Sequence, residues 1–462
     1  MAEFDDRIDA LPLSPYHLWI FTIGFVIVLL DGFDGSSLAF AAPALSAELG
    51  FATTSLGPIF SAHLVGMVLG SAVLGILADR YGRRPAIIVS IVIFALFTGL
   101  TAFEHAFDRF ILFRFLTGIG LGGAAGNAIA ICGEFAPGRL RTTVVSIVYS
   151  AFPLGSVFGG YMAVWLIKAF GWRSIFLVGA GVILPVLLLF ILTFPESVRF
   201  QRARGIPVAR IQATLRRLQM SEPDIAAVGQ IEAAAFRRAK QVSPVSALFS
   251  DGMWKRTLPL WLTFFVNQVV VYFLFMWMPT VMKTWGLGAS TGIIASATQS
   301  LGGVVGAFIL ARLIDRRGPY GILLVAYILA FVLAGAVGSA AAQGSVVIIG
   351  TVAICGFFLN GANVNLAGVA TEIYPTAARS TGVGWALGIG KAGGIAGSMI
   401  GGILLKSSLS LALLYPLAAC PLLLACASMW YLRRIDQASA HDDLPHEEGD
   451  RIQNPALNLT GS

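Results

Sequence analysis

Charged residues are scarce in this chain. Asp, Glu, Lys and Arg make up 12% of its 462 residues, whereas hydrophobic residues make up 57%, and that balance excludes a water-soluble protein. The chain instead carries repeated apolar runs of about 20 residues, the length that an α-helix needs to cross a bilayer. The short alternating segments that are typical of a transmembrane β-barrel do not occur. We therefore predict an all-α polytopic membrane protein.

Residues that would build an active site or a disulfide framework are also missing. The chain has four cysteines, and each falls inside an apolar run, where it acts as a small buried hydrophobe. The Gly-rich segments 118–126 and 388–402 are small-residue stripes for helix packing and do not match a Walker loop. Neither a nucleophile triad nor a set of metal ligands is recognisable. We expect no enzymatic activity, no metal and no cofactor.

The apolar runs predict 12 membrane spans. Their approximate positions are 18–45, 54–78, 86–103, 110–133, 143–167, 174–194, 257–281, 291–311, 319–342, 345–370, 381–405 and 409–432. Alternating the loops between two sides places 24 of the 31 Lys and Arg residues on the side of the N-terminus and five on the other. Basic residues gather on the cytoplasmic side of membrane proteins. We therefore expect a protein of the plasma (inner) membrane with both termini in the cytoplasm.

This asymmetry also accounts for the net charge of +7. We expect its surface partner to be anionic membrane lipid, not nucleic acid, and we expect the protein to function as a monomer. The acidic, polar segment 1–17 has neither a basic region nor a small-residue cleavage site, so we expect the first span to be retained.

The spans divide the chain into four parts. These are an N-terminal six-helix half at 1–194, a cytoplasmic linker at 195–256, a C-terminal six-helix half at 257–432 and a disordered cytoplasmic tail at 433–462. The linker is rich in Arg, and Ile206, Ala209, Leu215 and Leu218 recur at helical spacing within it. Such a stripe predicts amphipathic helices at the membrane interface.

The two halves repeat each other. Asp-Arg-Tyr-Gly at 79–82 recurs as Asp-Arg-Arg-Gly at 315–318, and a Glu-Pro-Arg set at 134–141 recurs at 372–379. Parallel six-span halves related by an axis along the membrane normal are the architecture of major facilitator transporters. We therefore predict a major facilitator fold with two pseudo-symmetric halves.

Segment 75–85 resembles the gating motif that major facilitators carry between spans 2 and 3. Its Gly75 would let a neighbouring helix approach closely, and Asp79 would pair with basic groups across the cytoplasmic face. The Glu-Pro-Arg sets are interpreted in the same way, as cytoplasmic ion-pair latches. The alternative is a solvated run of charge that only fixes topology. The predicted gate residues are Gly75, Asp79, Arg80, Gly82, Arg83, Glu134, Arg141, Asp315, Arg316, Glu372 and Arg379.

Two carboxylates, Asp31 and Asp34, interrupt the first span. An ionised Asp at the bilayer centre costs roughly 2.5–3.5 kcal/mol on insertion scales, so a pair of them requires partners or a purpose. Their i, i+3 spacing places both on one face of the helix. Repulsion between like charges in a low dielectric favours a proton on one of them. We predict that Asp31 and Asp34 carry the proton of an ion-coupled transporter.

Three segments narrow the family. They are Asp-Gly-Phe-Asp at 31–34 with Ala-Pro-Ala-Leu at 42–45, the segment 114–122 that opens with Arg114, and the segment 374–391 that ends with Lys391. Together they resemble the aromatic acid:proton symporter family of the major facilitators. That family usually has Arg where this chain has Lys391. Because Lys offers a point charge and not a bidentate fork, either carboxylate binding is looser here or the substrate differs.

The resemblance implies a cavity that binds a carboxylate. By depth, Arg114 lies in the same outer half as Asp34, so the two can form an ion pair, and protonation of Asp34 would free Arg114 for a substrate anion. The alternative for Arg114 is a cation that snorkels to the interface. The predicted substrate-binding residues are Arg114, Lys391, Asn127, Phe33, Tyr272, Trp277, Trp385 and Asn363. Pro279 is expected to interrupt the seventh span.

The predicted function is uptake of an organic anion, most simply an aromatic carboxylate, by proton symport with alternating access. A proton-driven exporter or antiporter of small organic compounds is the alternative. A cavity that carries only carboxylates would favour expelled cations, whereas Arg114 and Lys391 favour an imported anion. A membrane sensor is the third possibility, but the tail is too short for a signalling domain.

Overall fold

The structure is a computed structural model. It describes residues 9–204, 206, 208–221, 245–250, 252–375, 378–407 and 409–442. Within them, 12 helical segments are long and apolar enough to cross a membrane, which confirms the predicted number of spans. Predictions for 222–244 and for 443–462 fall outside the described residues.

The N-terminal half contains six long helices. They are α2 (Pro15–Leu49), α3 (Leu56–Tyr81), α4 (Arg83–Thr101), α5 (Phe107–Phe135), α6 (Arg141–Phe170) and α7 (Arg173–Thr193). Two short helices follow in the linker, α8 (Val198–Ala203) and α9 (Val208–Arg217). The C-terminal half contains α11 (Trp254–Thr284), α12 (Ala289–Arg317), α13 (Pro319–Ala341), α14 (Ser345–Ile373), α15 (Arg379–Lys406), α16 (Leu411–Ala419) and α17 (Pro421–Asp442).

Prolines and chain ends account for the differences from the predicted spans. Helix α11 continues through Pro279, so the predicted interruption there is wrong. The twelfth span is divided into α16 and α17, and α17 opens with Pro421, whose missing N–H suits a helix start. Helix α17 then continues to Asp442, so the first part of the segment predicted as a disordered tail is helical.

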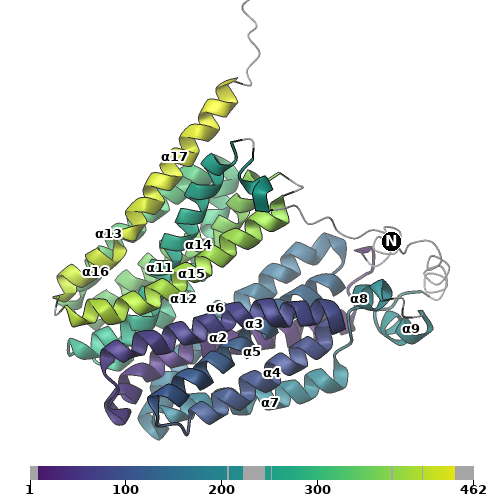
Figure 1. Ribbon diagram of the computed structural model, residues 1–462, viewed down its shortest axis with the longest axis horizontal. Helices are drawn as coiled ribbons and strands as arrows, with labels where there is room; N and C mark the ends of the chain where they lie inside the picture. Colours follow the sequence, from purple (N-terminus) through teal and green to yellow (C-terminus); the bar gives the residue numbers. More distant parts are fainter. Residues whose placement is uncertain are drawn as a thin grey trace, which may run out of the picture.

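The two halves meet at one end and diverge at the other. They diverge at the end where α8 and α9 lie, which we call the linker end, and they approach each other at the opposite, closed end (Figure 1). The helix pairs that join the halves are α2 with α11, α3 with α15 and α6 with α12. The molecule is therefore open toward the linker end.

Within the N-terminal half, glycines bring α2 and α6 into backbone contact. A Cβ atom on Gly32 would lie 1.9 Å from the carbonyl oxygen of Phe152, and one on Gly155 would lie 1.9 Å from that of Leu29. Only glycine permits an approach this close. The contact fixes the rotation of α2, the helix that carries Asp31 and Asp34.

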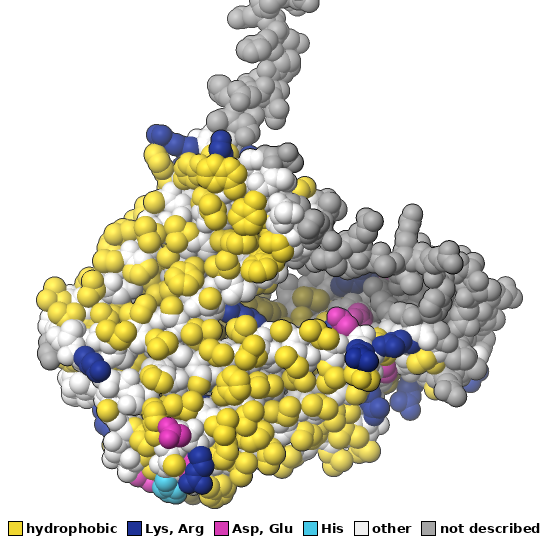
Figure 2. Space-filling model, viewed as in Figure 1, with side chains coloured by type: hydrophobic (Ala, Val, Ile, Leu, Met, Phe, Trp, Pro, Cys, Tyr) yellow, Lys and Arg dark blue, Asp and Glu magenta, His cyan; other side chains and the backbone are white. Residues whose placement is uncertain are grey.

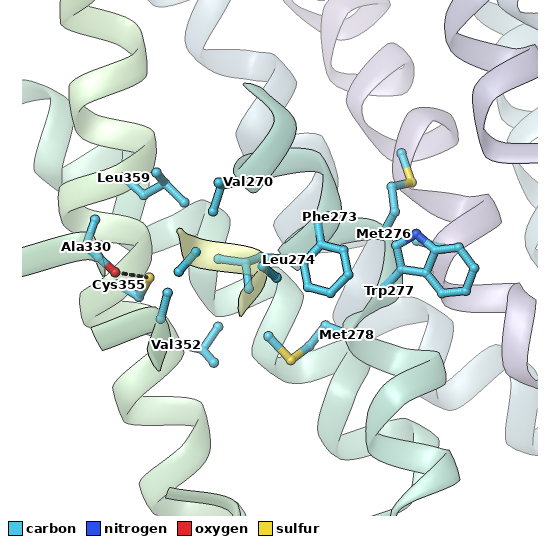
Figure 3. Close-up of a cluster of buried hydrophobic side chains, with 14 of the residues drawn as sticks. Val270, Phe273, Leu274, Met276, Trp277, Met278, Ala330, Val352, Cys355 and Leu359 are labelled. Atoms are coloured by element: carbon cyan, nitrogen blue, oxygen red, sulfur yellow. Dashed lines mark hydrogen bonds between the residues drawn. The ribbon is translucent and has the colours of Figure 1, made fainter. Parts of the chain in front are cut away.

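The core of the C-terminal half is apolar and is organised around α11. Val270, Phe273 and Leu274 are buried with Leu359 of α14 in a cluster that Figure 3 shows, and the thiol of Cys355 donates to the carbonyl oxygen of Ala330 at 3.7 Å. The four cysteines are free, and Cys355 is buried. The rigid part of this half therefore surrounds α11.

The linker helices pack against the N-terminal half. Ile211, Leu215 and Leu218 of the linker are each buried at 1% exposure or less, in the cluster that contains the N-terminal helices. Leu215 and Leu218 of the predicted stripe thus contribute to the core of the N-terminal half. Helices α8 and α9 lie at the end where the halves diverge (Figure 1).

We predict that Gly155→Ala lowers the free energy of unfolding by about 1–3 kcal/mol, because the added methyl group forces α2 and α6 apart. Gly181→Ala on α7 is the matched control, since a Cβ atom there meets open space. In the control, the free energy of unfolding is expected to rise by up to about 1 kcal/mol, because Ala has a higher helix propensity than Gly. Thermal unfolding of the purified variants measures the difference, and equal behaviour of both variants would contradict the close α2–α6 contact.

Candidate functional site

A central hollow lies between the two halves and opens at the linker end. The space-filling view shows this opening, with a Lys or Arg side chain at its inner end (Figure 2). The closed end is held by contacts between the halves. The hydroxyl of Ser61 donates to the carbonyl oxygen of Ile395 at 3.2 Å, and Lys283 Nζ donates to that of Pro43 at 2.6 Å. A solute thus reaches the centre of the molecule from one side only.

Asp31 and Lys391 bring opposite charges together from the two halves. Asp31 on α2 is 4% exposed, and its Oδ1 has no hydrogen-bond partner among the described residues. Lys391 on α15 is exposed, interacts electrostatically with Asp31, and donates to the hydroxyl of Ser71 on α3 at 3.4 Å. Lys391 is therefore an exposed cation that is attracted to Asp31 across the two halves, and no ion-pair contact joins the two side chains among the described residues.

Two tyrosines lie beside this pair. Tyr272 on α11 interacts electrostatically with Asp31 and with Tyr149 on α6, and Tyr149 also interacts with Asp31. Tyr272 was predicted from the sequence. Tyr149 was not predicted, although a phenol inside an otherwise apolar span was a usable signal. The site thus contains phenol groups from both halves.

Asp34 and Arg114 form the predicted ion pair, but in the interior of the N-terminal half. Arg114 Nη1 lies 3.5 Å from Asp34 Oδ2, and both side chains are 0% exposed. Arg114 Nη2 donates to the hydroxyls of Thr98 at 3.2 Å and Thr117 at 2.9 Å, and its guanidinium lies 4.9 Å from the ring centre of Phe176. Arg114 is therefore not a snorkelling cation. It does not face the hollow in this conformation either.

His63 belongs to the same buried group. Its Nδ1 lies 3.3 Å from the backbone carbonyl oxygen of Arg114, and its side chain is 1% exposed. Like Asp34, it is reached only if the helices of this half move.

Several predicted substrate residues pack elsewhere. Phe33 is 5% exposed, and its ring lies against Gly159 of α6 and Gly179 of α7, inside the N-terminal half. Trp277 is fully buried at the closed end, where Nε1 donates to the carbonyl oxygen of Ser398 at 2.9 Å. Figure 3 shows its ring directed toward the helices of the other half, and it packs edge-on against Phe60 at 5.3 Å. Phe33 and Trp277 were predicted to bind substrate, but in this conformation both pack between helices.

Asn127, Trp385 and Asn363 complete the predicted set. Asn127 accepts a hydrogen bond from Arg83 at 2.9 Å and thus belongs with the gate residues. Trp385 is exposed on α15 and stacks on Trp261 at 5.9 Å. Asn363 on α14 accepts a hydrogen bond from Asn267 of α11 at 2.8 Å. Trp385 and Asn363 therefore both contact α11, because Trp261 and Asn267 lie on that helix.

The first gate motif forms a charge cluster at the linker end. Arg83 lies 3.7 Å from Asp79 and 3.3 Å from Glu134. Ser197 donates a hydrogen bond to Glu134, and Glu196 accepts the backbone N–H groups of Arg83 and Arg84, so its carboxylate caps the start of α4. The cluster therefore joins the motif to the linker.

Glu196 also explains why position 82 is glycine. Gly82 has φ +113, and a Cβ atom there would lie 2.2 Å from Glu196 Oε2. Burial raises the pKa of the Glu196 carboxyl, while the backbone N–H groups of Ser197, Arg84 and Arg83 oppose that shift. Sequence analysis missed Glu196, whose signal was a lone acid directly after the sixth span.

The predicted latches are not formed in this conformation. Arg141 pairs with Asp9 instead of Glu134, and Arg379 is directed to the backbone oxygen of Tyr374 at 3.5 Å instead of Glu372. A Cβ atom on Gly75 would meet no atom within 4 Å, so the close helix approach expected there is absent. Both partners of each predicted latch lie in the same half, so the opening between the halves does not explain why the latches are absent.

The remaining gate residues lie at the surface. Arg80 stacks on the ring of Tyr81 at 5.5 Å and accepts a hydrogen bond from Arg204 through its carbonyl oxygen. Asp315, Arg316 and Glu372 are exposed and form no ion pair within the part of the chain that the structure describes. Nor do the described residues include a group of three or more His, Cys, Asp or Glu placed to hold a metal ion.

Comparisons with known proteins agree with this architecture. The sequence model of the Major Facilitator Superfamily matches residues 24–398. The chain is 36% identical over 421 residues to the gallate transporter of Pseudomonas putida, which covers 91% of this chain and 92% of that protein. It is 37% identical over 401 residues to the 4-hydroxybenzoate transporter of Pseudomonas aeruginosa, with 86% and 88% covered.

Solved structures show the same fold. A crystal structure of a D-xylose–proton symporter gives a TM-score of 0.69 at 20% identity, covering 90% of this chain and 97% of that one. An inward open conformation of the xylose transporter of Escherichia coli gives a TM-score of 0.70 at 19% identity, covering 90% and 96%.

Two six-helix halves around a charged hollow define a multi-pass membrane transport protein and not an enzyme. The chain belongs to the Major Facilitator Superfamily, and within it to the family of its aromatic acid transporters. This confirms both the predicted fold and the family resemblance.

The buried pair generates a stability prediction. Arg114→Met should lower the free energy of unfolding by about 3–5 kcal/mol, because it leaves Asp34 buried without a partner. The double variant Asp34→Leu/Arg114→Met should be more stable than Arg114→Met, since no buried charge remains. Thermal unfolding in detergent measures both.

The control for that pair is Arg109→Gln, which removes an ion pair with Glu104 whose Arg side chain is 68% exposed and should change stability by less than about 1 kcal/mol. A double variant that is no more stable than Arg114→Met would show that Asp34 and Arg114 do not act as a pair.

Proposed function

We propose that this protein imports an aromatic carboxylate together with protons across the plasma (inner) membrane by alternating access. The linker end is the cytoplasmic end in this proposal, so both termini are cytoplasmic and the structure represents the inward-open state. The monomer is the transporting unit, and membrane lipid surrounds it.

The observation that carries the proposal is that buried Asp31 and exposed Lys391 attract each other across the two halves. One charge comes from each half, and the exposed ammonium group of Lys391 is the cation that an anion entering from the linker end meets. The relatives support the substrate class, since they are named for gallate and 4-hydroxybenzoate, both aromatic carboxylates.

Protonation of Asp31 couples the transport of the proton to the transport of the acid. While Asp31 is ionised, it competes with the substrate carboxylate for Lys391. A proton on Asp31 removes that competition and releases Lys391 to bind the anion, because a neutral carboxyl group attracts an ammonium only weakly. When Asp31 loses its proton on the cytoplasmic side, it competes for Lys391 again and expels the acid.

The proton also solves an energetic problem. An inside-negative potential opposes an entering anion by about 2.3 kcal/mol per 100 mV for each charge. One proton cancels the charge of a monocarboxylate, and each further proton adds drive from the potential.

Arg114 has a supporting role in this proposal. Its guanidinium is already bound by Asp34 and two threonine hydroxyls inside the N-terminal half. The substrate carboxylate therefore binds Lys391, and the Asp34–Arg114 pair holds α2 and α5 in register around Asp31. The charge cluster of Arg83, Glu134 and Glu196 holds the gate motif while the cytoplasmic side is open.

Uptake by protein reconstituted in liposomes tests the proposal. An inward proton gradient should drive accumulation of a labelled aromatic carboxylate, and a protonophore should abolish it. Asp31→Asn mimics the protonated state, so it should still bind and exchange the acid but should not accumulate it against a gradient.

Variants of Lys391 test whether its positive charge is needed to bind the acid. Lys391→Gln should weaken binding of the acid about 10- to 100-fold, as expected for loss of a charge-assisted hydrogen bond, while Lys391→Arg should retain binding. Accumulation by Asp31→Asn, or acid binding that is unaffected by Lys391→Gln, would refute the coupling site. Outward transport of organic cations driven by the proton gradient would instead identify an exporter.

A further inference from the structure

A group of amide side chains lies at mid-membrane depth in the C-terminal half. Asn267 and Gln268 are near the middle of α11, Gln299 is on α12, and Asn360 and Asn363 are one turn apart on α14. Apolar side chains would pack these helices equally well. Amide side chains, by contrast, need hydrogen-bond partners when they are buried, so their presence here requires an explanation. The proposed transport function assigns a role to none of the first four.

Asn267 has a fixed orientation and an unused acceptor. Its Nδ2 donates to Asn363 Oδ1 at 2.8 Å, so its own Oδ1 is directed away from Asn363. The side chain is 0% exposed, and Oδ1 has no donor among the described residues. A buried acceptor without a donor is unfavourable unless a ligand or water supplies one for part of the cycle.

Gln268 extends the same set toward Lys391. Its Cγ lies 3.4 Å from where a Cβ atom on Gly390 would be, and Gly390 directly precedes Lys391 on α15. The Gln268 side chain is half-buried, and its Oε1 also lacks a donor in the described part of the chain. Gln268 therefore packs against the residue that precedes Lys391, on a helix that contacts α11 closely.

Asn360 on α14 and Gln299 on α12 also have amide atoms without hydrogen-bond partners. Asn360 Nδ2 lies 3.5 Å from the backbone oxygen of Gln299, while Asn360 Oδ1 finds no donor among the described residues. Gln299 is fully buried, and neither of its amide atoms has a partner there. The unused atoms of this group are mainly acceptors, and they carry no charge.

We propose that Asn267 and Gln268 form a specificity subsite that accepts hydrogen bonds from hydroxyl groups on the ring of the substrate. Neutral acceptor oxygens bind O–H groups and do not attract a carboxylate. The acid then binds with its carboxylate at Lys391 and its ring hydroxyl at the amides. This inference rests on the proposed function, since it deepens the recognition of the same substrate.

The members of the group differ in burial. Gln268, Asn360 and Asn363 each retain exposed surface, whereas Asn267 is fully buried. An unsubstituted acid would leave the acceptors unpaired. A site built to hydrogen-bond a hydroxyl discriminates against the analogue that lacks it for this reason.

Binding of benzoate and its three monohydroxy derivatives to the purified full-length protein tests the subsite. At least one hydroxybenzoate should bind about 10-fold more tightly than benzoate, the value of one hydrogen bond that is otherwise left unmade. Asn267→Leu should reduce this preference about 5- to 10-fold while benzoate affinity stays within about 3-fold. Gln268→Met, at a half-buried position, gives the same test if Asn267→Leu does not fold.

Asn365→Leu is the matched control. Asn365 is also an amide of α14, but its Nδ2 donates to the backbone oxygens of Gly361 at 2.8 Å and Ala307 at 3.1 Å, away from Asn267. It should leave the preference for hydroxybenzoate unchanged. Retention of the full preference in both Asn267→Leu and Gln268→Met, or no preference in the unaltered protein, would overturn the subsite. Absence of any acid binding, or acid binding that Lys391→Gln does not weaken, would overturn the proposed function instead.

Discussion

A charged side chain inside a membrane requires a partner of opposite charge. Helix α2 carries two such side chains, Asp31 and Asp34, and the rest of the structure depends on how each is neutralised. Asp34 is neutralised within its own half by Arg114, whose remaining groups bind Thr98 and Thr117. Asp31, one turn earlier, is attracted to Lys391 on the other half without an ion-pair contact. One helix thus carries a carboxylate that is paired within its own half and a carboxylate that is attracted across the two halves.

The glycine contacts and the gate cluster support that arrangement. The α2–α6 contact at Gly32 and Gly155 fixes the rotation of α2, so that Asp31 and Asp34 face different surroundings. At the linker end, Glu196 ties the start of α4 to the linker. The moving surfaces are then the faces of whole halves, and the interior of each half remains closely packed. This separation allows a charged hollow to open without exposing buried charges to lipid.

The sequence predicted the fold well because each span is a long apolar run and because two motifs repeat in order. It also predicted the Asp34–Arg114 pair, since depth and charge leave few partners. The sequence was less informative where a substrate-binding role was predicted from the presence of an aromatic side chain alone. Phe33 and Trp277 are packing residues, and a ring gives no signal of the face on which it lies. The gate pairs also differ, because a charged side chain near a helix end has several partners within reach, and Arg141 pairs with Asp9 instead of Glu134.

The central claim is that a proton on Asp31 and an anion on Lys391 are bound together. The most direct measurement is the pH change of a weakly buffered solution when an aromatic carboxylate binds to the purified protein, at a pH at which Asp31 is ionised in the free protein. The account predicts that the protein takes up protons on binding and that Asp31→Asn binds the acid without uptake. Binding without proton uptake by the unaltered protein, or equal uptake by Asp31→Asn, would contradict it.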